Sequence, residues 1–267
     1  MFFRLCYRSW NARDDEKVGN IGFNPLIDYV RDSAMKKWFD SYSIPARIFP
    51  SLVSALPAFV LVFFLSADAQ LKELGRFLLS LKFYGGITLG IVALYFYSQV
   101  IRFASKLLEE SFFIRASGFP TTYLMTYADT TYSSTYKDKY HTNVKRDFDI
   151  ALLDETSEAN DPDDARKRLA EAAKQVILKV GKGQLVFKHN VWYGFIRNVI
   201  GGSFFSLAFC CVNILIGTTV MKSTRLVVIS LVLLVPYGFV LIVRKRLLRQ
   251  NAEAYAKQLI AEYIAST

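Results

Sequence analysis

The sequence predicts an all-α membrane protein with four transmembrane helices in two hairpins and a helical insert between the hairpins. Of the 267 residues, 52% are hydrophobic, and the mean hydropathy of +0.24 lies between that of soluble domains and that of pure transporters. Four long apolar runs carry charges only at their ends. No polar–apolar alternation is long enough to indicate a strand.

The four apolar runs each have about the length of a transmembrane helix, which needs about 20 residues to cross a hydrocarbon core of about 30 Å. A single run could be a buried core helix, but four that end at charged residues indicate membrane spans. Only four residues separate the last two runs, so these should form a tight hairpin. The runs are residues 48–67, 83–101, 198–221 and 226–243.

Cations near the span ends favour both termini and the central insert in the cytoplasm. The sequence "RKRLLR" follows the fourth run, and Lys36, Lys37 and Arg47 precede the first. The short loops are themselves basic, so this bias is modest. Arginines interrupt the apolar N-terminus "MFFRLCYRSW", so we expect no cleaved signal peptide and an inner (cytoplasmic) membrane location.

The chain therefore divides into five parts. The N-terminal segment should contain an amphipathic helix, because Asn24 and Pro25 can begin a helix whose apolar side chains recur every four residues up to Trp38. The insert is the candidate ligand-sensing domain, and the C-terminal tail is basic. The parts are the cytoplasmic N-terminal segment 1–47, hairpin 48–104, insert 105–195, hairpin 196–243 and cytoplasmic tail 244–267.

Two helices are predicted inside the insert. One begins at the capping residue Asp161 and Pro162 and ends at Gly181. Its apolar stripe consists of Ala165, Leu169, Ala172, Val176 and Val180. The other runs from about residue 134 to 148, and its apolar stripe consists of Tyr136, Tyr140, Val144 and Phe148.

The second of these helices carries the basic, aromatic stretch "YKDKYHTNVKR". A single-stranded nucleic acid needs cations for its phosphates and rings on which bases can stack. A plain solvated helix face is the competing interpretation, and the N-terminal segment, with Arg4, Arg8 and Trp10, competes for the same role. The candidate ligand-binding residues are Tyr132, Tyr136, Lys137, Lys139, His141, Lys145 and Arg146.

The second and third spans carry polar stripes and continue as helices beyond the membrane. Such stripes either pack against small residues of a neighbouring helix or face water. Four spans enclose little water, so an aqueous path would need several subunits. The candidate pore-lining residues are Thr88, Tyr95, Gln99, Arg102, Ser203, Ser206 and Asn213.

Enzymatic and metal-dependent functions are not expected. The cysteines lack CxxC spacing, and the two histidines, His141 and His189, lack a helical metal-binding partner. Asp129, His141 and Asp147 could be combined into a catalytic group but match no hydrolase motif. The sequence therefore predicts no cofactor, no metal and no catalytic residue.

Residues 105–202 contain several short motifs: Pro-Thr-Thr, Asp-x-Thr, Lys-x-x-Tyr-His and Asn-x-x-Tyr-Gly-Phe-x-Arg-Asn. With these motifs the chain resembles bacterial four-span membrane effectors of anti-phage defence, in particular the ion-channel effector family of the Hailong system. The residues concerned are Pro120, Thr121, Thr122, Asp129, Thr131, Lys137, Tyr140, His141, Asn190, Tyr193, Gly194, Phe195, Arg197 and Asn198.

The resemblance implies a homo-oligomeric ion channel, which we expect to be a homotetramer in contact with membrane lipid. A short single-stranded DNA, made by a partner nucleotidyltransferase, would hold the channel closed. Loss of this DNA during infection would open the channel and kill the cell by abortive infection. Two other functions remain open: a membrane-anchored adaptor that recruits proteins without conducting, and a membrane-bound enzyme acting on lipid or nucleotide.

Overall fold

The computed structural model describes residues 42–67, 86–115 and 118–266. Within these ranges the chain is helical and contains no strand, which confirms the all-α prediction. The predicted N-terminal amphipathic helix and the loop 68–85 lie outside them. The helices are η1 (Ile44–Ile48), α2 (Phe49–Ala67), α4 (Gly86–Arg115), α5 (Pro120–Tyr123), α6 (Ser134–Phe148), α7 (Glu155–Asn160), α8 (Pro162–Val180), α9 (Gln184–Thr219) and α10 (Thr224–Ala265).

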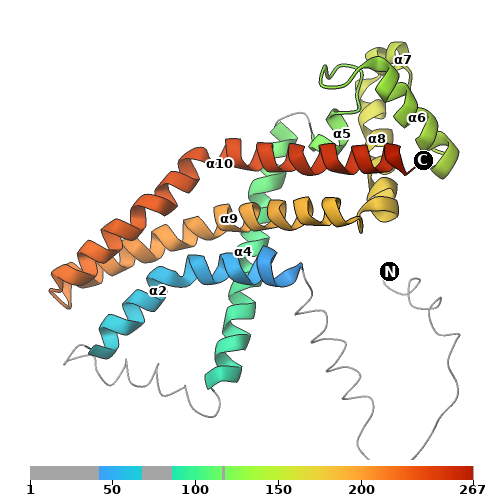
Figure 1. Ribbon diagram of the computed structural model, residues 1–267. Helices are drawn as coiled ribbons and strands as arrows, with labels where there is room; N and C mark the ends of the chain where they lie inside the picture. The colour runs from blue at the N-terminus through green and yellow to red at the C-terminus, as the bar shows by residue number, and fades with distance from the viewer. Residues whose placement is uncertain (1–41, 68–85, 116–117, 267) are drawn as a thin grey trace, which may run out of the picture. The chain divides into compact units, whose positions relative to one another are not determined.

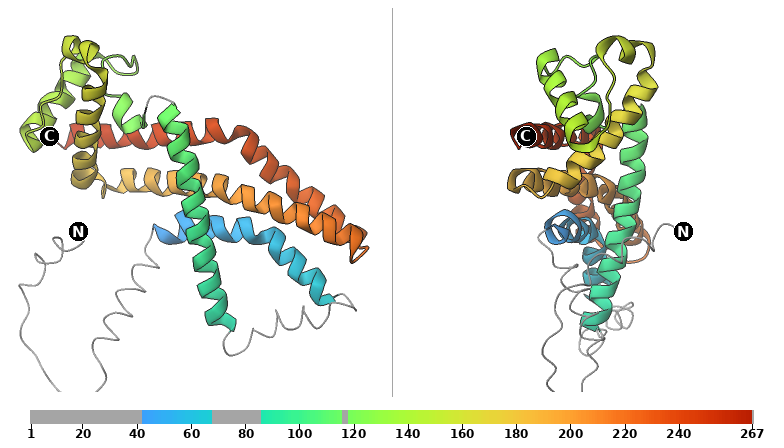
Figure 2. Two further views of the ribbon diagram at one scale, coloured as in Figure 1. Left: turned by 180° about the vertical axis from the view of Figure 1, so that it is seen from behind. Right: turned by 90° about the vertical axis from the view of Figure 1, so that its right-hand side faces the viewer.

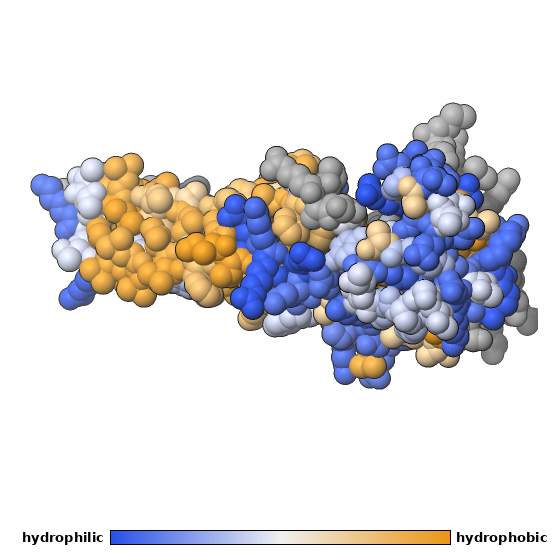
Figure 3. Space-filling view, turned by 90° about the horizontal axis from the view of Figure 1, so that it is seen from above, coloured by the Kyte–Doolittle hydropathy of each residue, from blue (hydrophilic) through white to orange (hydrophobic). Residues whose placement is uncertain are grey.

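Four helical stretches are long and apolar enough to cross a membrane, as expected of a multi-pass membrane protein. Large apolar side chains point outward from them; Phe96 is 70% exposed and Ile242 is 81% exposed. Figure 3 shows this apolar surface at the end that carries the α9–α10 turn, with mostly hydrophilic surface beyond it. Contact of such side chains with lipid is favourable, whereas their exposure to water is costly in free energy. The stretches are Ile44–Ser66, Gly90–Phe113, Gln184–Thr219 and Thr224–Ala265.

Helices α9 and α10 form a long antiparallel pair joined by a short turn (Figure 1). The Ser223 Oγ accepts a hydrogen bond from the Leu226 N–H at 3.4 Å and so caps α10. Helix α2 packs on α9, whereas α4 runs across α9 instead of alongside it, and both viewing directions agree on this (Figures 1 and 2). The α9–α10 turn is therefore observed, and the predicted α2–α4 hairpin is not established.

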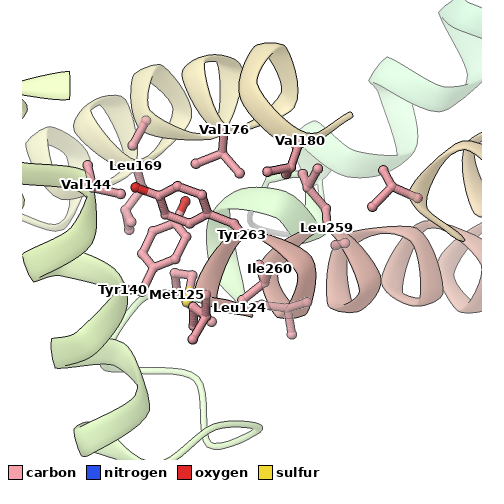
Figure 4. Close-up of a cluster of buried hydrophobic side chains, with 14 residues drawn as sticks. Leu124, Met125, Tyr140, Val144, Leu169, Val176, Val180, Leu259, Ile260 and Tyr263 are labelled. Atoms are coloured by element: carbon pink, nitrogen blue, oxygen red, sulfur yellow. The ribbon is translucent and has the colours of Figure 1, made fainter. Parts of the chain in front are cut away.

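Helices α5 to α8 and the end of α10 form a separate helical module with its own apolar core (Figure 4). Local signals fix its helices: the Ser133 side chain caps α6, and Asp161 accepts from the Asp164 N–H to cap α8. Helix α6 ends at Asp149, which adopts a left-handed conformation with φ 56°. The core consists of Leu124, Met125, Tyr140, Val144, Leu169, Ala172, Val176, Val180, Val186, Ala256, Leu259, Ile260, Tyr263 and Ile264.

The basic C-terminal segment predicted as a tail is a continuation of α10 that enters this core. Tyr263 is fully buried, and its ring packs edge-on against Tyr140 of α6, with the ring centroids 5.6 Å apart. Leu259 and Ile260 are also buried (Figure 4). One uninterrupted helix thus connects a candidate membrane span to the module.

Candidate functional site

The polar stripe of α9 is directed at the backbone of the continuous helical segment formed by η1 and α2. The Asn198 Nδ2 donates to the Ala46 carbonyl at 2.6 Å, the Ser206 Oγ to the Ser54 carbonyl at 2.9 Å, and the Asn213 Nδ2 to the Pro57 carbonyl at 2.9 Å. Ser203 is also buried and donates to the Val199 carbonyl of its own helix. Within one chain, therefore, the polar groups of α9 tie two helices together.

A proline in α2 provides a further tie, to α10. Pro57 has no N–H, so the carbonyl of Val53 one turn earlier loses its intrahelical donor. The Tyr237 hydroxyl of α10 donates to this carbonyl at 2.6 Å. Because an unsatisfied carbonyl is costly in lipid, this bond stabilises the contact between α2 and α10.

The other candidate pore residues lie on α4. Tyr95 is 39% exposed, and Gln99 and Arg102 are partly exposed. Of Thr88 the structure describes only the helical backbone. Arg102 lies close enough to Arg47 and Arg197 for electrostatic interaction, so cations of η1, α4 and α9 gather at one level.

A buried polar network joins α4 to α9 at the same level. The Glu109 carboxylate accepts hydrogen bonds from the Tyr193 hydroxyl and, at 3.0 Å, from the Arg197 Nη1. The side chains of Glu109 and Arg197 are only 9% and 13% exposed, and the Arg197 Nε has no partner in the described part of the chain. This network was not predicted from the sequence, although Tyr193 and Arg197 belong to the Asn-x-x-Tyr-Gly-Phe-x-Arg-Asn motif.

The aromatic members of the predicted ligand-binding set contact the module core. The Tyr132 and Tyr136 rings stack with centroids 4.8 Å apart, and both rings are partly buried. His141 is partly buried, with its Nε2 3.4 Å from the Met125 carbonyl oxygen. Burial lowers the pKa of His141, because it disfavours the charged form of the imidazole.

The cations of this set differ in accessibility. Lys137 is only 2% exposed and donates to the Asp129 carbonyl. Lys145 is exposed but pairs with Asp149 at 2.5 Å, and Arg146 is exposed and pairs with its neighbour Asp147. Lys139 is exposed and forms no ion pair with any residue that the structure describes. Lys139 is therefore the most available cation of the strip.

Asp147 connects three helices of the module. Its carboxylate accepts from Arg146 of α6 at 2.9 Å, from Lys179 of α8 at 2.6 Å and from the Tyr263 hydroxyl of α10 at 3.0 Å. The hydrogen bonds from Arg146 and Lys179 hold the pKa of Asp147 well below its usual range.

Asp147→Asn is expected to lower the thermal stability of the module by about 1 kcal/mol, because three donors lose a charged acceptor, while solvent screens the exposed partners Arg146 and Lys179. Since folding lowers the Asp147 pKa, its stabilisation is complete above the ordinary aspartate pKa of about 4 and is lost as pH falls below that value. Thermal unfolding followed by circular dichroism in detergent should show a smaller difference between variant and parent below pH ~4. The matched control is Asp149→Asn, at a side chain that is 90% exposed and has a single partner. Equal effects of the two changes would contradict the prediction.

A cavity of about 340 Å³ in the module was not anticipated from sequence. It lies where α4, α5, α8 and α10 meet, and it places the aromatic rings of Phe112 and Tyr123 near Arg166 and Arg249. Asp129 of the Asp-x-Thr motif also lines it. Rings beside cations can hold a base with an attached phosphate. Arg166 and Arg249 are paired with Asp163 and Glu253, and Glu158 also lines the cavity, so this second candidate ligand site is less basic than the strip on α6.

No group of His, Cys, Asp and Glu side chains suited to a metal ion occurs in residues 42–67, 86–115 and 118–266. Comparison with known proteins finds no matching family model, no matching curated protein and no matching solved structure. The function is therefore argued from this geometry and from the motifs alone.

Proposed function

We propose that the chain is a subunit of a homo-oligomeric membrane ion channel that acts as a cell-death effector in anti-phage defence. A nucleic-acid ligand such as a short single-stranded DNA, bound to the module on the cytoplasmic side, holds the channel closed. The finer topology belongs to the same proposal: two transmembrane hairpins, both termini in the cytoplasm, and an inner-membrane location.

The observation that carries this proposal is the continuity of α9 and α10 from the candidate spans into the module. Tyr263, at the far end of α10, packs in the module core, while Tyr237 of the same helix bonds to α2. A rigid helix transmits a displacement at one end to the other, whereas a flexible linker does not. A ligand that shifts the module can therefore shift the spans.

The need for several subunits follows from the polar contacts within the chain. The Ser206 and Asn213 side chains are bonded to α2, so the polar groups facing away from the chain's own core are mainly on α4. Copies of α4 around an axis would bring Tyr95, Gln99 and Arg102 together along a path. We propose that four copies form the ring. A partner nucleotidyltransferase would make the ligand.

A protein-recruiting adaptor is the second candidate, favoured by apolar side chains on the surface near the α8–α9 junction. Leu178 is 76% exposed, Leu185 is 54% exposed and Trp192 is 55% exposed. Exposed apolar clusters of this kind mark contacts with proteins or membranes. An adaptor would assemble without conducting.

Purified protein in a planar bilayer is expected to conduct ions, and short single-stranded DNA added on the module side should reduce the current. Lys139→Glu should weaken this inhibition by about tenfold, because it reverses an exposed charge that pairs with no described residue, in a contact dominated by phosphates. The matched control is Lys174→Glu on α8, also exposed. Absence of current would favour the adaptor. If the Lys139 variant conducts and DNA inhibits it as strongly as the parent, we would instead assign ligand binding to the cavity lined by Arg166 and Arg249.

A further inference from the structure

A second cavity lies at the level where the apolar surface of α10 ends. It encloses about 360 Å³ between α4, α9 and α10. Phe112, Ile200 and Leu248 give its lining an apolar part. Arg244 and Lys245 of α10 and Ser111 of α4 give it a polar part, with Arg244 one turn before Leu248 on the same helix. The cavity therefore combines an apolar surface with two adjacent cations.

The position of this cavity along α10 corresponds to a membrane surface. Ile242, just before the cations, is 81% exposed, as a lipid-facing side chain would be. Arg244 and Lys245 follow directly and are exposed. Figure 3 shows the corresponding change along the molecule, from apolar surface to a hydrophilic patch. The cations thus lie at the depth of lipid headgroups on the module's side of the membrane.

These cations have no acidic partner in the part of the chain that the structure describes. The Arg244 Nη1 donates to the Leu241 carbonyl of its own helix at 2.7 Å, and Lys245 forms no ion pair there. Further along α10, by contrast, Arg249 is paired with Glu253 at 2.7 Å. Glu110, beside Ser111 on α4, is exposed and forms no ion pair with either cation. The cavity therefore keeps a net positive charge.

We propose that this cavity binds the phosphate headgroup of an anionic phospholipid, with the first part of an acyl chain against Phe112, Ile200 and Leu248. Arg244 and Lys245 bind the phosphate, and Ser111 donates a hydrogen bond to it. Basic pockets between membrane helices recognise anionic lipids by this combination of charge and apolar contact. The bound lipid would join α4 to the α9–α10 pair.

Native mass spectrometry of the detergent-solubilised full chain, mixed with phosphatidylglycerol or phosphatidylcholine, tests the proposal. The parent should retain phosphatidylglycerol in preference to phosphatidylcholine. Arg244→Gln with Lys245→Gln should lower phosphatidylglycerol retention by at least about tenfold. The matched control, Lys222→Gln in the turn before α10 with Arg225→Gln in the first turn of α10, removes the same charge elsewhere and should retain the parent's preference.

A third variant separates a formed cavity from diffuse charge attraction. Ser111→Trp fills the cavity from an exposed position without changing the charge, and it should also lower retention several-fold. The proposal would be overturned if either cavity variant retained phosphatidylglycerol as well as the parent does. It would also be overturned if the Lys222 and Arg225 control lost as much phosphatidylglycerol as the Arg244 and Lys245 variant. Competition by millimolar inorganic phosphate as strong as that by phosphatidylglycerol would instead indicate a free-phosphate site and would also overturn it. Unchanged circular dichroism of each variant without lipid confirms that folding is retained.

Discussion

Glu109→Ala is expected to destabilise the protein by about 3 kcal/mol, because it leaves the Arg197 guanidinium largely buried without its carboxylate. The Tyr193 hydroxyl loses its acceptor in the same change. The measurement is the midpoint of thermal unfolding in detergent. The adjacent Glu110→Ala serves as the control, because this exposed carboxylate forms no ion pair with a residue that the structure describes.

A double variant distinguishes the loss of the ion pair from the loss of packing. In Glu109→Leu with Arg197→Leu neither partner remains charged, so much of the stability lost in Glu109→Ala should return. If the double variant is less stable than Glu109→Ala, the buried network is not what holds α4 against α9. In the proposed channel, the Glu109 variant should also alter the proposed response to DNA, because the network lies toward the module ends of α4 and α9.

Gly202→Val is expected to prevent close packing of α9 on α2 and to cost at least about 2 kcal/mol. A Cβ at position 202 would lie 2.7 Å from the Ser54 Cβ, an atom that no side-chain rotation can move away. The helices must then separate, which also breaks the Ser206 hydrogen bond to the Ser54 carbonyl. Small residues permit such close approach in membranes, where helix contacts depend on packing.

Gly238→Val in α10 is the matched control for Gly202→Val, since a Cβ at position 238 would meet no atom within 4 Å. Both substitutions place valine in an apolar helix, so intrinsic helix propensity affects them alike. Size-exclusion chromatography and thermal unfolding in detergent should show aggregation or a lowered midpoint for the Gly202 variant alone. Similar behaviour of the two variants would indicate that the α2–α9 contact is not tightly packed.

Local signals allowed the module helices to be predicted closely. Helix α6 spans Ser134–Phe148 and α8 spans Pro162–Val180, as the sequence indicated. Caps, a proline at the first turn and a terminating glycine act within a few residues, so they are readable without the fold. All five residues of the predicted α8 stripe are buried.

The accessibility of the basic strip could not be predicted from the same patterns. Spacing every four residues placed Tyr140 and Val144 in the core correctly. Lys137 lies three residues before Tyr140 and so shares its face, and its amine reaches the Asp129 carbonyl in the loop just before α6. Which cations remain available for a ligand therefore depends on how the loop before α6 folds back and on which side chains pair, and helical spacing alone does not specify either. The ligand itself stays a prediction.

The sequence by itself determined the all-α class, the four apolar helices long enough to cross a membrane, and the boundaries of α6 and α8, because length, composition and capping act locally. Only the tertiary structure decided that the end of α10 completes the module core, that Glu109 pairs with Arg197, and that Ser206 and Asn213 bond to α2. The hydrogen bonds among these contacts join residues 84 to 156 positions apart in the sequence, from Tyr193 with Glu109 to Asn213 with Pro57. Such partners are selected by packing across the whole chain, and no local pattern specifies them.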